Sequence, residues 1–225
     1  VTSVSNTNSN FLNGGEDSIR INLEYNGTPE GGEKITLRPS DTLFLYDDAG
    51  IPFPSNNFTG QLELNDMLPP SIDSISVPID SFIILMESNP ITFRFNEKLD
   101  SVAFTVSSTV MDTVKYSSSL TDDYLQITLE PPLASYDSIS IDFPYLEDES
   151  SLTTVDIAYT YRTPILGDYD LDGQISFNDM WDLVENWEAK NYSYELGPFE
   201  GTVPHLISFP DSKFNVEDLS LIHIS

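Results

Sequence analysis

The stretch D-Y-D-L-D-G-Q-I-S-F-N-D, from Asp168 to Asp179, is the most informative part of this 225-residue chain. It has carboxylates at the first, third, fifth and twelfth positions and a glycine at the sixth. In such a loop alternate side chains point inward, and the glycine permits a sharp turn. Ca²⁺ prefers about six to eight oxygen ligands, which this spacing supplies. The sequence therefore predicts a calcium-binding loop rather than an acidic surface turn.

Each expected ligand has a defined place in this loop. The side chains expected to bind the cation are Asp168, Asp170, Asp172 and Asp179. Gln174, at position seven, would offer its backbone carbonyl, and Ser176, at position nine, would bind directly or through a water molecule. Gly173 would allow the turn.

A helix is predicted directly after the loop. Apolar residues recur there at the spacing of one helical face: Met180, Leu183, Val184 and Trp187. Asp179 lies in the first turn, where a negative charge suits the helix dipole. Because Asp179 is also an expected ligand, we expect loss of calcium to loosen the helix.

The loop and its helix resemble the repeats of dockerins. The loop ends in Asp rather than the Glu of a standard EF-hand, and no clear helix pattern precedes it. Dockerins are small calcium-binding modules with two loop–helix halves, found at the C-termini of secreted bacterial proteins. The resemblance runs from Leu166 to the C-terminus. It implies a small α-helical, EF-hand-like module over residues 164–225 that binds a cohesin-like protein or another cell-surface component.

The second half of such a module is incomplete. The candidate is P-D-S-K-F-N-V-E-D-L, Pro210 to Leu219, with Ser212 in place of the glycine. Ile207 and Phe209 fall at positions one and three and offer no side-chain oxygen. Glu195 would supply the first ligand if a loop were inserted, although a solvated acidic loop explains these residues equally well. The expected ligands of this second site are Glu195, Asp211, Asn215 and Asp218.

In dockerins the cohesin contacts come from positions ten and eleven of each loop. These positions hold Phe177 and Asn178 in the first half and Val216 and Glu217 in the second. Because the two pairs differ, the resemblance does not extend to a pseudo-twofold binding surface. Phe177 is expected to pack in the core beside Met180, with a partner contact as the alternative.

From Val1 to about Pro164 the sequence predicts β-structure, because short runs alternate apolar and polar residues between turn-forming clusters. Residues 70–163 hold about seven such runs, a number and spacing that suit an immunoglobulin-like sandwich. The runs are Ile72 to Val77, Ile83 to Met86, Ile91 to Phe95, Val102 to Val106, Leu125 to Leu129, Ile139 to Phe143 and Val155 to Tyr161. The stretches Asn89 to Val102 and Leu125 to Leu133 resemble bacterial Ig-like domains of surface-layer and exported proteins.

Residues 1–69 are predicted to form another Ig-like β domain, short enough to be partial. Its expected strand residues are Ile19, Ile21, Leu23, Tyr25, Leu43, Leu45, Leu62 and Leu64. Pro69 and Pro70 mark the expected boundary, since two prolines stiffen a connector and cannot continue a sheet ladder. The predicted fold is thus mainly β: tandem Ig-like sandwiches, then the small α-helical module.

Composition restricts the partners. The chain has 9 Lys and Arg against 37 Asp and Glu, a net charge of −28. This charge argues against binding nucleic acid or an anionic membrane surface. No apolar stretch reaches membrane-spanning length, so membrane insertion is not expected. The two histidines, His205 and His223, lie far apart and without cysteine, so neither zinc nor triad chemistry is expected.

The sequence therefore predicts a non-catalytic C-terminal region of an exported bacterial protein, extracellular or at the cell surface, that serves in spacing, attachment or assembly. The alternative is a polysaccharide-binding or adhesion module in which calcium is purely structural, with aromatics such as Trp181, Tyr192 and Tyr194 stacking on sugars. We expect the chain to be a fragment, since it begins with Val1, and any catalytic domain to lie upstream. Leu219 to Ser225 resembles a translated transposon adapter, with a short helix start as the alternative.

Overall fold

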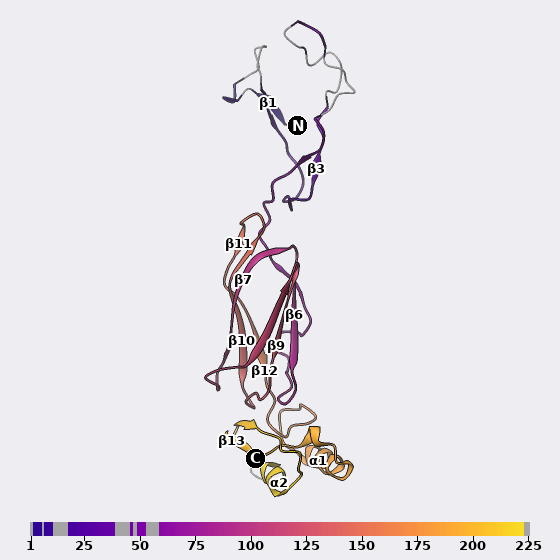
Figure 1. Ribbon diagram of the computed structural model, residues 1–225, viewed down its shortest axis with the longest axis vertical. Coiled ribbons are helices and arrows are strands. Elements are labelled where there is room, and N and C mark those ends of the chain that lie inside the picture. Colours follow the sequence, from indigo (N-terminus) through magenta and orange to yellow (C-terminus); the bar gives the residue numbers. More distant parts are fainter. Residues whose placement is uncertain are drawn as a thin grey trace. The chain divides into compact units, whose positions relative to one another are not determined.

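The computed structural model describes residues 2–5, 7–10, 18–38, 46, 49–52 and 59–222 (Figure 1). The chain divides into two compact units, Val1–Leu68 and Pro69–Ser225, and the division falls at the two prolines. The residues expected to form the calcium module therefore belong to the same unit as the main β block. Leu43 and Leu45, both expected in strands, and His223 lie outside the described ranges.

The first unit contains short antiparallel pairs of strands. Strand β1 (Ser3–Ser5) pairs with β2 (Arg20–Asn22), and β3 (Lys34–Ile35) pairs with β4 (Leu62–Glu63). None of the described residues of this unit belongs to the buried hydrophobic cluster of the chain. In its described part the unit therefore shows two small sheets rather than a full sandwich.

The second unit begins with eight strands in two sheets, which makes the chain mainly β. One sheet has the order β5-β6-β9-β8, and the other is β11-β10-β12 with β7 on the opposite edge of β10. All pairings are antiparallel. The strands are β5 (Ile72–Ile75), β6 (Asn89–Phe95), β7 (Leu99–Ser108), β8 (Tyr116–Thr121), β9 (Tyr124–Leu129), β10 (Ser138–Asp148), β11 (Thr153–Thr154) and β12 (Ile157–Arg162).

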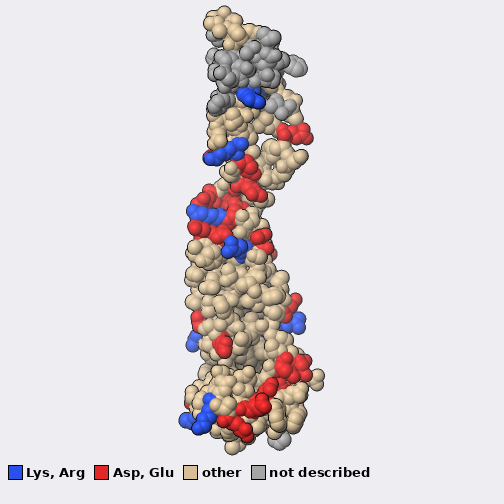
Figure 2. Space-filling view, turned by 90° about the vertical axis from the view of Figure 1, so that its right-hand side faces the viewer, with Lys and Arg blue, Asp and Glu red and all other residues tan. Residues whose placement is uncertain are grey.

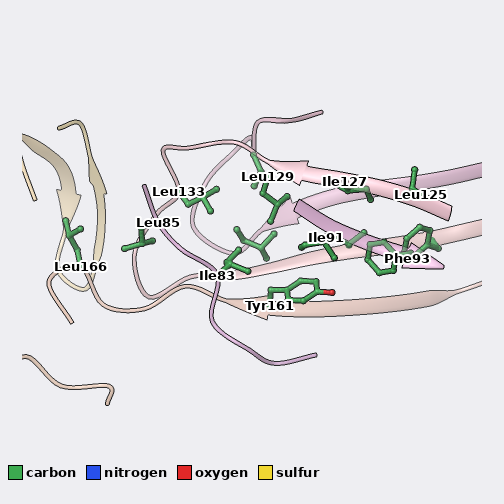
Figure 3. Close-up of a cluster of buried hydrophobic side chains, with 14 of the residues drawn as sticks. Ile83, Leu85, Ile91, Phe93, Leu125, Ile127, Leu129, Leu133, Tyr161 and Leu166 are labelled. Atoms are coloured by element: carbon green, nitrogen blue, oxygen red, sulfur yellow. The ribbon is translucent and has the colours of Figure 1, made fainter. Parts of the chain in front are cut away.

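The core of this unit lies between the two sheets. Strands β6, β9 and β10 bury every second residue over most of their length, as the two-residue period of a strand requires. Phe93 of one sheet and Phe143 of the other meet edge to face with ring centroids 4.9 Å apart. The row of core side chains continues through Ile83 and Leu85 toward Leu166 (Figure 3).

Two details of the predicted strands were wrong. Residues Ile83 to Met86 form no strand, although Ile83 and Leu85 are buried; Phe82 alone makes an isolated bridge to Arg162. The alternation of apolar residues also failed to predict β8, whose residues are all exposed. The remaining six runs of the block each coincide with part of a strand.

The C-terminal part combines helices with a hairpin. Its elements are α1 (Phe177–Ala189), the 3₁₀ turn η1 (Tyr192–Tyr194), β13 (Phe199–Thr202), β14 (His205–Ser208) and α2 (Val216–Ile222). The small α-helical module expected from the sequence therefore also contains the β13–β14 hairpin, which was not predicted. Helix α2 continues past Asp218 through Ile222, as the helix-start alternative requires. Among the described helices, none has both the length and the apolar character to cross a membrane.

The hairpin joins the C-terminal part to the sandwich. Ala134 bridges Ile207, and the backbone N–H of Ser135 donates to the carbonyl of Leu206 at 2.8 Å. The buried Ser135 hydroxyl accepts from the Leu206 N–H at 2.9 Å and donates to the Pro204 carbonyl at 2.6 Å. Leu206 also belongs to the same hydrophobic cluster as the sandwich core. The module is therefore packed onto the sandwich rather than tethered by a linker.

We predict that Ser135→Ala weakens this attachment. The substitution removes both hydroxyl hydrogen bonds and leaves a buried N–H group unpaired, which should lower the free energy of unfolding by about 1–3 kcal/mol. Calorimetric melting of the full chain measures the change. Ser119→Ala, at an exposed position of β8, is the control; equal melting of the two variants would contradict the prediction.

Candidate metal centre

The first loop brings three carboxylates together. One oxygen from each of Asp168, Asp170 and Asp172 lies within 4.8 Å of the other two. Asp168 is buried, and its oxygens accept hydrogen bonds from the N–H groups of Gly173 at 2.9 Å and Asp172 at 3.2 Å. Gly173 has a φ of +87°, a left-handed conformation that glycine adopts without strain. The predicted turn is therefore formed, with its acids grouped on one side.

Asp179 closes this loop by binding backbone N–H groups. One of its oxygens accepts from Tyr169 at 2.8 Å, and the other accepts from Ser176 at 2.7 Å. Ser176 is the N-cap of α1, and its hydroxyl accepts from Asn178 at 3.1 Å, which completes a capping box. Asp179 is fully buried and is not part of the group of three acids. It thus ties the start of the loop to the start of the helix.

The positions of the other two expected ligands, Gln174 and Ser176, give less support to cation binding. Gln174 is exposed, and its N–H donates to Asp172 at 2.8 Å. The Ser176 hydroxyl is already engaged as the helix cap, so a water-mediated contact with a cation is easier for it than a direct one.

The second loop is formed around Glu195 and Asp218, both of which are fully buried. The carboxylate of Glu195 accepts from the N–H groups of Asp211 at 2.7 Å and Lys213 at 3.2 Å. The carboxylate of Asp218 accepts from Leu196 at 2.9 Å on one oxygen and from Asn215 at 2.7 Å on the other. These acids are therefore not solvated surface groups.

The two loops share one hydrogen-bond arrangement. Glu195 corresponds to Asp168, because each accepts from backbone N–H groups in the middle of its loop. Asp218 corresponds to Asp179, because each binds the residue after the first ligand and the residue at the helix cap. Residues 198–210, which contain the β13–β14 hairpin, interrupt the second loop. A first ligand at Glu195 requires an inserted segment in the second loop, and this hairpin-containing segment is present.

Turn and cap positions correspond as well. Ser212 has a φ of +62° at the place of Gly173. Asn215 accepts from the Glu217 N–H at 2.7 Å, as Ser176 accepts from Asn178. The second loop therefore repeats the first in its backbone, not only in its spacing.

The carboxylates of the two loops differ in their electrostatics. Burial, aided by the negative charge of Asp179, raises the pKa of the Asp168 carboxyl. Burial would also raise the pKa of Asp179, but hydrogen bonds from the N–H groups of Ser176 and Tyr169 outweigh it and lower that pKa. Burial, and then the nearby Asp211, raises the pKa of Glu195. A cation would relieve the unfavourable ionisation of Asp168 and Glu195.

The second loop has a weaker set of candidate ligands than the first. Gly197 stands where the first loop has Asp170, so one carboxylate is missing. The remaining mid-loop acid, Asp211, forms an ion pair with Lys213 at 3.0 Å, and this hydrogen bond lowers the Asp211 pKa. A divalent cation would have to compete with the lysine there. We therefore expect weaker cation binding in the second loop.

Some residues of α1 that were expected to be buried are exposed instead. Leu183 is fully buried, and Trp187 stacks on Phe214 with ring centroids 5.4 Å apart. Phe177, expected in the core, is 74 % exposed, and Met180 beside it is also exposed. The inward face of the helix follows Asp179, Leu183 and Trp187, because Asp179 must point into the loop.

An aromatic and aliphatic surface on α1 therefore faces solvent. Its members are Phe177, Met180, Trp181 and Val184, and we refer to them as the α1 apolar face. The rings of Phe177 and Trp181 lie 6.5 Å apart. Of the other candidate sugar-binding aromatics, Tyr192 is exposed and stacks on Phe214, and Tyr194 packs on Tyr169, so each ring already contacts another ring of the module.

No protein-family model matches this chain, and comparison with curated proteins finds no match. The geometry of the two loops, rather than relatedness to a known protein, is therefore the basis for assigning a function.

We predict opposite effects of two substitutions at equivalent turn positions. Gly173→Ala should destabilise the unit by about 1 kcal/mol, because an L-residue is strained at positive φ, while no atom would clash with the added Cβ. Ser212→Gly should relieve the same strain in the second loop and have a neutral or stabilising effect. Chemical denaturation of both variants without added calcium tests this; destabilisation by Ser212→Gly would contradict it.

Proposed function

We propose that the first loop binds Ca²⁺ through Asp168, Asp170 and Asp172. The main support for this proposal is that three carboxylate oxygens lie within 4.8 Å of one another. The turn that brings them together is held by hydrogen bonds from the N–H groups of Asp172 and Gly173 to the Asp168 carboxylate. Oxygen ligands from acids, a carbonyl and water are those that Ca²⁺ prefers. Gln174 would add its carbonyl, and Ser176 would contribute through water. Asp179 would stabilise the loop and join the shell as the twelfth residue.

The second loop is proposed to bind Ca²⁺ more weakly, through Glu195, Asp211, Asn215 and Asp218. The shared hydrogen-bond arrangement supports this extension, because the same backbone would present its ligands in the same way. The missing acid and the Lys213 ion pair argue for lower affinity.

The arrangement of two loop–helix halves supports assignment of residues 164–225 as a dockerin-like module with a hairpin inserted in its second loop. The strand order of the sandwich supports an Ig-like assignment for residues 70–163. With β5, β6, β7, β8, β9, β10 and β12 taken as strands A to G, the sheets are A-B-E-D and C-F-G, the order of constant-type immunoglobulin domains.

We further propose that the chain is a non-catalytic region of an exported bacterial protein that attaches it to a partner outside the cell. The α1 apolar face is the proposed contact surface, because Phe177 occupies loop position ten and Trp181 lies one turn further along. Exposed aromatic residues of this kind are common anchors of protein interfaces. A cohesin-like protein is the proposed partner, with the sandwich acting as a spacer.

The second candidate function is recognition of a polysaccharide, with calcium only structural. One observation favours it: Trp181 is 55 % exposed, and its ring offers a flat surface for a sugar. Tyr192 and Tyr194 support it less, since the ring of Tyr192 stacks on Phe214 and the ring of Tyr194 packs against Tyr169.

We predict that calcium stabilises the unit through the first loop. At about 100 times its Kd, one bound ion should add about 2.7 kcal/mol to the free energy of unfolding. Asp172→Asn should abolish this increment from the first loop, because it removes a charged ligand while keeping an oxygen that can accept from Gln174. Thermal melting with calcium and with chelator measures the effect.

The control for this experiment is Asp182→Asn, which removes one negative charge from α1 outside the loop. It should retain the calcium response. The Tyr169 backbone N–H donates to Asp179, so its rate of hydrogen exchange reports on the first loop itself. Unchanged melting and exchange on calcium addition to the unsubstituted chain would contradict calcium binding.

We predict that the double substitution Phe177→Ala and Trp181→Ala abolishes binding to cohesin domains. Surface plasmon resonance of the calcium-loaded chain against a panel of purified cohesins measures binding. Val155→Ala, at an exposed apolar position of the sandwich, serves as the control and should leave binding unchanged. If no cohesin binds the unsubstituted chain while a glycan array shows selective binding, the polysaccharide function replaces this proposal.

A further inference from the structure

A second group of acids lies at the end of the sandwich away from the module. Strand β10 ends at Asp148, which pairs with Leu99, the first residue of β7. Glu97 precedes Leu99 in the β6–β7 turn, so the register brings Glu97 and Asp148 to the same end. A carboxylate oxygen of Glu97 lies within 4.8 Å of one of Asp148. This pair takes no part in the calcium loops.

The unusual feature of this pair is one oxygen of Asp148. The residue is 1 % exposed, and its Oδ1 accepts from the N–H groups of Ser150 at 2.7 Å and Leu152 at 2.9 Å. Its Oδ2 is buried and has no hydrogen-bond partner within the described part of the chain. Leaving a charged oxygen buried and unpaired is unfavourable, and a second carboxylate nearby makes it more so.

The nearby Lys98 does not neutralise the charge of these two carboxylates. Lys98, next to Glu97 in sequence, forms an ion pair with Glu149. The hydrogen bond to Glu149, and then the charges of Glu149, Asp122 and Asp100, raise the pKa of Lys98. Acidic side chains gather around basic ones at this end of the sandwich (Figure 2). The surroundings are therefore negative, and the adjacent lysine is already engaged elsewhere.

The spacing of the two carboxylates suits a divalent cation. Ca²⁺ binds oxygens at about 2.3–2.6 Å, so two ligands on opposite sides of one ion lie up to about 5 Å apart. The Glu97 and Asp148 oxygens lie within 4.8 Å of each other, which is close enough for both to bind one ion. Asp148 would contribute Oδ2 while its Oδ1 remains bound to the turn, so the backbone need not rearrange.

We propose that Asp148 and Glu97 form a further Ca²⁺ site, distinct from the two loops of the module. Oδ2 of Asp148 is a ligand fixed in place by the β10–β11 turn, and Glu97 is the ligand from the β6–β7 turn. Water completes the coordination shell. The ion neutralises negative charge at this end of the sandwich and links the β10–β11 turn to the β6–β7 turn, which connects the two sheets.

The test is calcium titration of the full chain, monitored by two-dimensional NMR of backbone amides. The Ser150 and Leu152 amides, which donate to Asp148, should shift in a saturable manner as calcium is added. Asp148→Asn keeps an oxygen for these donors but removes the charge, so the shifts should be lost. Glu97→Gln, in the turn, should cause the same loss without altering a buried residue.

Asp100→Asn is the matched control, since it removes one exposed charge at the start of β7 and should leave the saturable shifts in place. Calorimetric titration should show one fewer bound calcium in Asp148→Asn than in the unsubstituted chain. Absence of saturable shifts at Ser150 and Leu152 in the unsubstituted chain would overturn the proposal. Their persistence in both Asp148→Asn and Glu97→Gln would also overturn it.

Discussion

The C-terminal part of this protein depends on two buried carboxylates that bind the backbone of their own loops. Asp179 and Asp218 each accept N–H groups from both ends of a loop. Charge-assisted hydrogen bonds of this kind are stronger than neutral ones, and here they also begin the next helix. The loops therefore have a defined shape before any cation is considered. That shape leaves the remaining acids of the first loop grouped and facing one another.

The interrupted second loop connects this chemistry to the sandwich. Its inserted hairpin pairs with residues 134–135, and Leu196 and Leu206 extend the sandwich core into the module. Glu195 and Asp218 hold the two ends of the insertion together through Asp211 and Leu196. Ordering of the second loop is thus coupled to attachment of the module. A rigid connection of this kind suits a region that spaces and presents a contact surface.

Much of the fold could be predicted from the sequence, because apolar and polar residues alternate along a strand that has one buried face. It failed for β8, where Y-S-S-S-L-T has no buried face to report. It also failed for Ile83 to Met86, where the Asn89 side chain binds the Ile84 N–H and carbonyl in place of a neighbouring strand. The first loop was visible because its expected ligands fall within the single run from Asp168 to Asp179. The hairpin separates the expected ligands of the second loop, so these residues could be named only by assuming an insertion after Glu195. Phe177 was misplaced because the capping box turns Asp179, not its neighbours, inward.

The most direct test of the account is an anomalous difference map from crystals of this chain prepared with Tb³⁺, an ion that occupies calcium sites. We expect a strong peak surrounded by oxygens of Asp168, Asp170 and Asp172. A map with no peak among these three aspartates, at saturating Tb³⁺ concentration, would contradict it.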